Sequence, residues 1–162
     1  MRNVECGFRT LVGSRWLEKN EPDGGHMNGL EFYERYQEIG RTAKRKGPVT
    51  PEMDLQEWKQ FTDGCVAGYD DNLAEYQGDL WIRRNIQLAL DDEELREMEG
   101  FSAFSEAVSR VNQVFRSVAT AAFPSRNPSG FAWWNLTVPR YGGEEFAFDL
   151  RRECGIVIPA KE

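Results

Sequence analysis

The chain has 162 residues, of which 40% are hydrophobic and 29% charged, and its formal net charge is −7. This composition excludes a largely disordered protein. The length fits a single domain, residues 1–162, that can bury roughly 70% of the surface of its unfolded chain. The negative charge argues against direct binding to nucleic acid or to an anionic membrane, because both need a basic protein surface. It suits a protein partner whose own surface is basic.

The cysteines indicate a reducing compartment. Cys6, Cys65 and Cys154 are odd in number and far apart, and no CxxC pair occurs. We therefore expect free thiols and no thiolate zinc site. The chain has no run of about 20 apolar residues, and no signal-peptide core lies near its start. These features predict a cytoplasmic protein with no membrane contact, no metal and no cofactor, and they leave its oligomeric state open.

The first predicted helix follows a loop rich in turn-forming residues. Asn28 has the character of an N-cap, and Glu31 stands three residues later, which is the spacing of a capping box. The helix is expected to run to residue 46, where basic residues suit the negative end of the helix dipole. Its inward stripe is predicted to consist of Leu30, Tyr33, Tyr36 and Ile39.

The segment Thr50–Glu52 is a strong helix start. Thr can cap the helix, Pro suits the first helical position, and Glu complements the positive end of the dipole. The side chains expected to pack inward are Leu55, Trp58 and Phe61. Residues 62–72, rich in Gly and Asp, are predicted to interrupt the helix. A further helical region is expected from Leu73 or Asp79 to Leu90, with Gly78 as the point where it divides.

The next two segments are an acidic run and the clearest helix of the chain. Residues 91–100 are predicted to form a short helix that ends at Gly100. Ser102 is then expected to cap a helix over residues 103–123. Apolar residues recur there every three or four positions and form one continuous stripe, Phe104, Ala107, Val108, Val111, Val114, Phe115, Val118 and Ala122.

The last part of the chain, residues 130–160, is predicted to be a β-hairpin or meander. Apolar and polar residues alternate over 131–138 and again over 145–150, and the glycines at 142 and 143 suit a turn between two strands. Residues 155–159 are a candidate third strand. Because residues 1–125 are mainly helical, the predicted fold class is α+β, with four or more helices followed by a C-terminal antiparallel β-meander of two or three strands.

Trp133 and Trp134 are adjacent in the first of these predicted strands. A strand points successive side chains to opposite faces, so only one of the two rings can enter the core. The alternation places Trp134 inward and leaves Trp133 on the other face with Phe131. Exposed Trp and Tyr are common in binding hot spots, so we predict a protein-binding role for Phe131, Trp133 and Tyr141. The alternative is that a helix covers this face as well.

The acidic run is the second candidate for protein binding. Residues 91–100 carry six carboxylates against Arg96 and so account for five of the seven net negative charges. One interpretation is a solvated helix start, since acidic residues favour the first turn of a helix. The other is an electrostatic surface for a basic partner, formed by Asp91, Asp92, Glu93 and Glu94.

Residues able to carry catalysis are few. His26 is the single histidine, which excludes a site with several imidazoles on one metal within one chain. Any Ser–His or Cys–His arrangement would have to use it, and no nucleophile motif accompanies it. Cys65 is flanked by aspartates, which disfavour a reactive thiolate. Asp70 and Asp71 do not match a calcium loop, although a magnesium site at this pair is conceivable.

Three classes of function follow from these features. The preferred hypothesis is a small acidic cytoplasmic protein that acts by protein–protein binding. Examples are an inhibitor, an immunity or antitoxin protein, or a phage protein that antagonises a host defence nuclease. The alternatives are an enzyme without a recognisable local motif and a structural or assembly subunit of an oligomer. We expect binding rather than catalysis, so no catalytic residue is predicted.

Overall fold

The computed structural model describes residues 28–122 and 132–161. The first of these two parts is mainly helical and contains α1 (Asn28–Thr42), α2 (Pro51–Ala67), α3 (Leu73–Asp79), α4 (Trp81–Asp91), α5 (Glu93–Arg96), α6 (Phe101–Val118) and the strand β1 (Ala119–Ala121). The second part contains the 3-10 helix η2 (Trp133–Leu136), the strand β2 (Thr137–Pro139), helix α7 (Glu144–Asp149) and the π-helical turn η3 (Leu150–Cys154).

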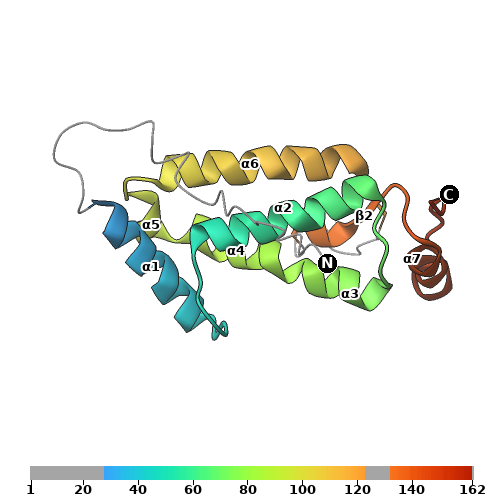
Figure 1. Ribbon diagram of the computed structural model, residues 1–162, viewed down its shortest axis with the longest axis horizontal. Coiled ribbons are helices and arrows are strands. Elements are labelled where there is room, and N and C mark those ends of the chain that lie inside the picture. The colour runs from blue at the N-terminus through green and yellow to red at the C-terminus, as the bar shows by residue number, and fades with distance from the viewer. Residues whose placement is uncertain (1–27, 123–131, 162) are drawn as a thin grey trace, which may run out of the picture.

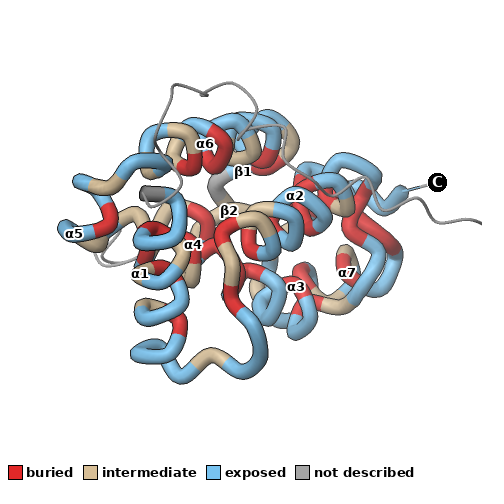
Figure 2. Tube along the Cα trace, turned by 60° about the vertical axis from the view of Figure 1, so that its left-hand side comes forward, coloured by how far each residue is buried: buried red, intermediate tan, exposed pale blue. Residues whose placement is uncertain are grey.

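The helices α2, α4 and α6 run along the long axis of the molecule, and α2 packs against both of the others (Figure 1). Helix α1 crosses one end of this layer, where it contacts α4 and α5, while α7 lies at the opposite end. Buried residues lie mainly where the helices face one another (Figure 2). The largest fully buried side chains are aromatic, namely Trp58, Tyr76, Phe104, Phe115 and Phe146. Burial of such side chains supplies the main driving force for folding.

Residues at the helix starts account for where these helices begin. Thr50 caps α2, since its Oγ1 accepts a hydrogen bond of 3.2 Å from the Met53 amide, and Pro51 takes the first helical position as predicted. The region from Leu73 to Leu90 is helical as predicted, but it divides at Leu80 and not at Gly78. The predicted helix after residue 100 is also present, although Ser102 lies inside it. Gly100 precedes α6 with φ 97°, a conformation that favours glycine.

Three residues predicted to face inward are more exposed. Leu30 is 61% exposed and Val114 is 44% exposed, while Leu55 is half-buried. In α1 the buried positions are Phe32 and Tyr36, which are four residues apart and therefore lie on one face. The error at Leu30 is one of phase, because Leu30 lies two positions before Phe32 and therefore about 200° away from it around the helix.

The fold class is α+β, as predicted, with helices followed by a small antiparallel sheet. The sheet pairs β1 with β2, and Thr120 lies opposite Val138. The strand predicted over 131–138 therefore shrinks to Thr137–Pro139, because residues 133–136 form η2. Its partner is β1, at the end of α6, and not the chain that follows Gly142 and Gly143.

The second and third predicted strands are wrong. Residues 144–149 form α7. Phe146 and Leu150 are both buried, and a separation of four residues fits one face of a helix as well as one face of a strand. Phe148, which a strand would have buried with them, is 60% exposed. Residues 155–159 form no strand, and only Ala160 makes a single bridge to Gly142.

The glycine pair serves close packing and not a hairpin turn. The Gly143 amide donates a hydrogen bond of 2.7 Å to the Tyr69 carbonyl. A Cβ atom at Gly142 would lie 2.6 Å from Cδ1 of Phe146, and one at Gly143 would overlap Asp70. The chain between β2 and α7 can therefore approach the end of α2 only because both residues lack a side chain.

Within the described residues, no helix has the length and apolar character that crossing a membrane requires.

Candidate functional site

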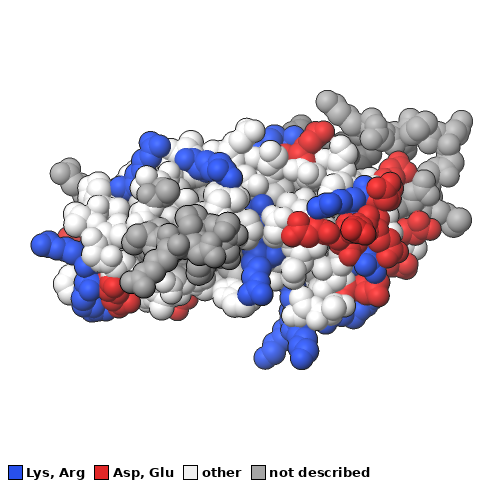
Figure 3. All heavy atoms as spheres, turned by 180° about the vertical axis from the view of Figure 1, so that it is seen from behind, with Lys and Arg blue, Asp and Glu red and all other residues white. Residues whose placement is uncertain are grey.

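The predicted acidic run lies beside α1, where it joins carboxylates that are far away in the sequence. We name the acidic end by its seven carboxylates, which are Glu31, Glu34, Glu38, Asp91, Asp92, Glu93 and Glu94. Figure 3 shows Asp and Glu side chains gathered over one end of the molecule. This is the end at which α1 meets α5 (Figure 1). The folding of α1 onto α5 thus concentrates negative charge that the sequence shows in two separate segments.

Arg35 of α1 holds the acidic end together. Its Nε and Nη2 donate to the two carboxylate oxygens of Asp92 at 3.1 and 2.7 Å. Its Nη1 lies 3.0 Å from Glu38 and 3.1 Å from Glu94. The hydrogen bonds from Arg35 lower the pKa of Asp92 below its ordinary value. Asp92 also caps α5, because its Oδ1 accepts a 2.8 Å hydrogen bond from the Leu95 amide.

The remaining carboxylates of the acidic end have fewer positive partners. Asp91 accepts a 2.8 Å hydrogen bond from Gln87 and lies 3.6 Å from Arg96. Among the described residues, no ion pair is formed by Glu31, Glu34 or Glu93, and all three are exposed. These side chains therefore carry negative charge that faces solvent.

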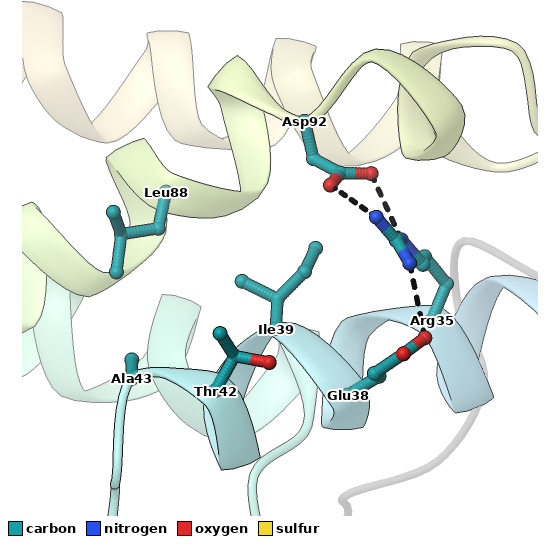
Figure 4. Close-up of a pocket in the computed structure, with 7 residues that line it drawn as sticks. All are labelled: Arg35, Glu38, Ile39, Thr42, Ala43, Leu88 and Asp92. Carbon is teal, nitrogen blue, oxygen red and sulfur yellow. Dashed lines mark hydrogen bonds and ion pairs between the residues drawn. The ribbon is translucent and has the colours of Figure 1, made fainter.

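A groove of about 280 Å³ lies between α1 and α4 beside the arginine (Figure 4). Its floor is apolar and is formed by Ile39, Ala43 and Leu88, while Glu38 and Asp92 stand at one end with Arg35 between them. Leu88 is 39% exposed. A long side chain with an apolar stem and a cationic head would match this lining, because the stem could contact the floor while the head faces Glu38.

A second, wider hollow of about 600 Å³ continues from the groove along the other side of α1. It is lined by Glu31, Glu34, Arg35, Gln37, Glu38, Arg41, Glu94 and Met98. Arg35 and Glu38 line both depressions, so they form one continuous surface. The carboxylates on its rim outnumber the arginines, and Met98 provides an adaptable apolar contact.

Asp54 of α2 is a different carboxylate, which is buried and whose two oxygens accept hydrogen bonds inside the fold. Its two oxygens accept hydrogen bonds of 2.5 and 2.6 Å from Arg45, and Tyr36 donates to it at 2.7 Å. Burial raises the pKa of Tyr36 above its ordinary value, and the negative charge of Asp54 adds to this effect. This cluster fixes the end of α1 against α2 and presents no charge to a partner.

The tryptophan pair lies on η2, toward the other end of the molecule from α5 (Figure 1). Trp134 is 5% exposed, so it is buried as predicted, although a 3-10 helix and not a strand places it there. Trp133 is half-buried. Its ring lies 5.9 Å from that of Phe115, and the guanidinium carbon of Arg116 stands 3.7 Å from its centroid. Helix α6 therefore covers part of Trp133.

The described residues of the other predicted binding set are not brought to the acidic end. Tyr141 is 36% exposed, and its hydroxyl donates to the Val66 carbonyl at the end of α2. Phe131 and His26 lie outside the described residues. The structure therefore unites Asp91, Asp92, Glu93 and Glu94 with α1, but it places Trp133 and Tyr141 elsewhere on the surface, where their role in binding stays a prediction.

The residues considered for catalysis or metal binding form no centre. Cys65 is a buried free thiol, and burial raises its pKa well above the ordinary value. Asp70 and Asp71 are exposed. In residues 28–122 and 132–161, no group of three His, Cys, Asp or Glu side chains is arranged to hold a metal ion.

Two features were not predicted from the sequence, one on the surface and one in the interior. Glu31, Glu34 and Glu38 share one face of α1 by helical spacing, but nothing in the sequence indicates that this face meets the acidic run. Arg83 is buried in α4 at 3% exposure. Its position next to Ile82 and three residues before Ile86 is the one signal that could have placed it on the inward face.

No protein family, no curated protein and no solved structure matches this chain.

Proposed function

We propose that this protein acts by binding another protein that has a basic surface, through the acidic end and the groove beside Arg35. The observation that carries the proposal is the meeting of α1 and α5, which collects seven carboxylates from two segments, five of which line one continuous depression. Charged surfaces of this kind steer association and select partners by electrostatic complementarity. The groove adds an apolar floor, which an ordinary solvated helix face does not offer.

The distribution of charge supports binding over simple solubility. Arg35 neutralises part of the acidic end but leaves Glu31, Glu34 and Glu93 facing solvent without an ion pair to a described residue. It also holds Asp92 and Glu38 in fixed positions at the groove. A carboxylate that is held in place loses less side-chain entropy when a partner binds, so the surface is partly pre-organised.

The chemistry of the surface indicates the kind of partner. Nucleic-acid grooves of nucleases are lined with Lys and Arg that contact phosphates. A protein surface with closely spaced carboxylates and shallow relief can occupy such a groove in place of nucleic acid. We therefore place this protein among inhibitors of nucleases, which include immunity proteins, antitoxins and phage antagonists of host defence.

The test is charge reversal on the acidic end against a matched reversal elsewhere. Glu34→Lys with Glu94→Lys changes the net charge by the same amount as Glu75→Lys with Glu145→Lys. All four positions are exposed, and the control pair lies on α3 and α7, away from α1 and α5. Binding to a panel of purified nucleases with basic grooves would be measured at two salt concentrations, together with their activity.

We expect the first pair to lower the association rate for a bound nuclease by at least about tenfold at low salt and the control pair by less than about twofold. Raising the salt to about 0.5 M should shrink the difference, since the Debye length falls well below 10 Å. Equal effects of the two pairs would contradict a role of the acidic end, and the absence of binding to any member of the panel would contradict this class of partner.

A further inference from the structure

A second site stands apart from the acidic end, at the tryptophan–arginine cluster formed by Arg83, Arg116, Trp133 and Trp134. The guanidinium carbon of Arg83 lies 4.3 Å from the centroid of Trp134, and that of Arg116 lies 3.7 Å from the centroid of Trp133. The two rings meet edge to face with their centroids 5.8 Å apart. Two cations from different helices, α4 and α6, are thus brought together by one pair of adjacent rings.

Arg83 is unusual because its charge is buried without a direct hydrogen bond or ion pair to a carboxylate of the described residues. Its Nε donates to Asn112 at 3.0 Å, and its Nη2 donates to Gln87 at 3.0 Å, so both partners are neutral amides. Its Nη1 is buried and has no hydrogen-bond partner in the part of the chain that the structure describes. An uncompensated buried charge is costly, and buried arginines are normally paired with an acidic group. Among the described residues no acidic group is hydrogen-bonded to this one.

Arg116 does not supply the missing compensation. It is exposed, it carries the same charge as Arg83, and within the described part of the chain it forms no ion pair. Burial lowers the pKa of Arg83 to about 10, the negative charge of Asp91 partly opposes this shift, and the positive charge of Arg116 contributes to it. Arg83 is therefore still protonated at neutral pH, and the cluster has an excess of positive charge.

A further unused donor belongs to the same cluster. Nε1 of Trp134 is buried and donates to no acceptor among the described residues. Trp58 shows the contrast, since its Nε1 donates to Asn112 at 3.1 Å. Buried N–H groups nearly always find an acceptor. Arg83 Nη1 and Trp134 Nε1 are therefore two buried donors without an acceptor among the described residues, and they belong to a cluster with two cations. A negatively charged group with several acceptor oxygens would satisfy both donors.

We infer that the tryptophan–arginine cluster binds an oxyanion, either a phosphate or a carboxylate group, with Arg116 as the exposed contact and Arg83 and Trp134 as the buried donors. Planar guanidinium groups bind both oxyanions through two parallel hydrogen bonds. The rings keep both guanidinium groups oriented while no anion is present. This site goes beyond the proposed binding through the acidic end, because it selects the opposite charge and shares no residue with it.

The test is a titration of the full chain with inorganic phosphate and with acetate, read by tryptophan fluorescence, with chloride at equal ionic strength as the reference. Wild-type protein is expected to show a saturable change that chloride does not produce. Arg116→Gln should weaken this binding by at least about tenfold, as expected for the loss of charge-assisted hydrogen bonds. Arg84→Gln is the matched control, because Arg84 is an exposed arginine 4.6 Å from the exposed ring of Trp81.

Arg83→Lys keeps the charge of the buried cation but removes its Nη1 donor, and it is expected to weaken binding as well. Should this variant fail to fold, as judged by circular dichroism, the comparison of Arg116→Gln with Arg84→Gln still tests the inference. Saturation by phosphate alone identifies a phosphate-bearing ligand, and comparable saturation by acetate identifies a carboxylate. The inference is overturned if neither anion gives a saturable change, or if Arg84→Gln weakens binding as much as Arg116→Gln.

Discussion

Arginine side chains have opposite surroundings in two regions of this molecule, the acidic end and the tryptophan–arginine cluster. At the acidic end, Arg35 contacts three carboxylates, and nearby Arg45 is held by both oxygens of Asp54. At the tryptophan–arginine cluster, Arg83 and Arg116 rest on aromatic rings and form no ion pair with a described carboxylate. The acidic end therefore has surplus negative charge, whereas the cluster holds two cations that form no ion pair with a described residue. Charges that are paired inside the fold stabilise it, and charges left over are available to a ligand.

The largest effect is expected at the ring that supports the unpaired cation. Trp134→Ala removes a nearly buried indole from beneath Arg83 and should lower the free energy of unfolding by about 3–5 kcal/mol. Trp81 provides the control, because it is 57% exposed and also contacts an arginine. Trp81→Ala should cost less than about 1 kcal/mol. Urea unfolding measures both, and similar losses would show that Trp134 is not a core residue.

The next effect concerns the buried carboxylate at the acidic side. Asp54→Asn leaves Arg45 without its ion pair and weakens the hydrogen bond from Tyr36. Arg45 keeps 18% side-chain exposure and can partly regain water, so the expected loss in unfolding free energy is about 2–3 kcal/mol. Asp63→Asn, which breaks an exposed ion pair with Lys59, should cost less than about 1 kcal/mol. Equal losses at the two positions would contradict the structural role of Asp54.

A pH-dependent effect is expected at Asp92. Asp92→Asn keeps an oxygen to cap α5 but removes the charge that Arg35 contacts, and it should cost about 1 kcal/mol at pH 7. Because Arg35 lowers the pKa of Asp92 in the folded state, the contribution is present above the unfolded pKa of about 3.9 and is lost as the pH falls through the folded value.

The difference between wild type and Asp92→Asn, measured by urea unfolding, should therefore shrink below about pH 3.9. Glu93→Gln is the control, since Glu93 is exposed and forms no ion pair with a described residue. It should show almost no change at either pH. A difference for Asp92→Asn that stays constant down to low pH would mean that the ion pair with Arg35 adds nothing to stability.

The smallest change is expected at Arg83, and it provides the sharpest contrast with Asp54. Arg83→Met removes a buried cation that forms no ion pair with a described carboxylate, while Asn112 keeps its hydrogen bond from Trp58 and Gln87 keeps its bond to Asp91. Replacing a buried charge by an apolar side chain of similar size is often neutral or stabilising, so we expect a change within about 1 kcal/mol. A loss as large as that of Asp54→Asn would show that Arg83 is a structural cation.

Helix starts and helical stripes could be predicted from the sequence because each depends on neighbouring residues. Thr50 and Pro51 fix the start of α2 locally, and the stripe of α6 repeats over five turns. The region after Gly142 could not be predicted in this way. Over only six residues, a spacing of four between Phe146 and Leu150 fits a strand and a helix equally, and tertiary contacts decide.

The candidate sites were predictable only in part, for a related reason. The acidic run at Asp91–Glu94 is evident in the sequence, but its union with Glu31 and Glu34 depends on how α1 packs against α5. Arg83 and Arg84 are adjacent and chemically identical, yet one is buried and the other exposed. They differ in burial because they lie on different faces of α4, and the tertiary packing of the tryptophan pair determines which face is covered. The sequence therefore shows where charged residues are, but the tertiary fold determines which of them form ion pairs.

The most direct measurement of this contrast is an NMR titration of the labelled protein with two probes of opposite charge. An arginine-rich peptide should shift the backbone amides of residues 31–38 and 91–98, whereas inorganic phosphate should shift those of Arg83, Arg116, Trp133 and Trp134. The two sets should not overlap, since no residue belongs to both sites, although α4 contributes to each of them. Shifts from both probes in one region, or shifts scattered over the whole surface, would contradict the division into an acidic protein-binding end and a cationic oxyanion site.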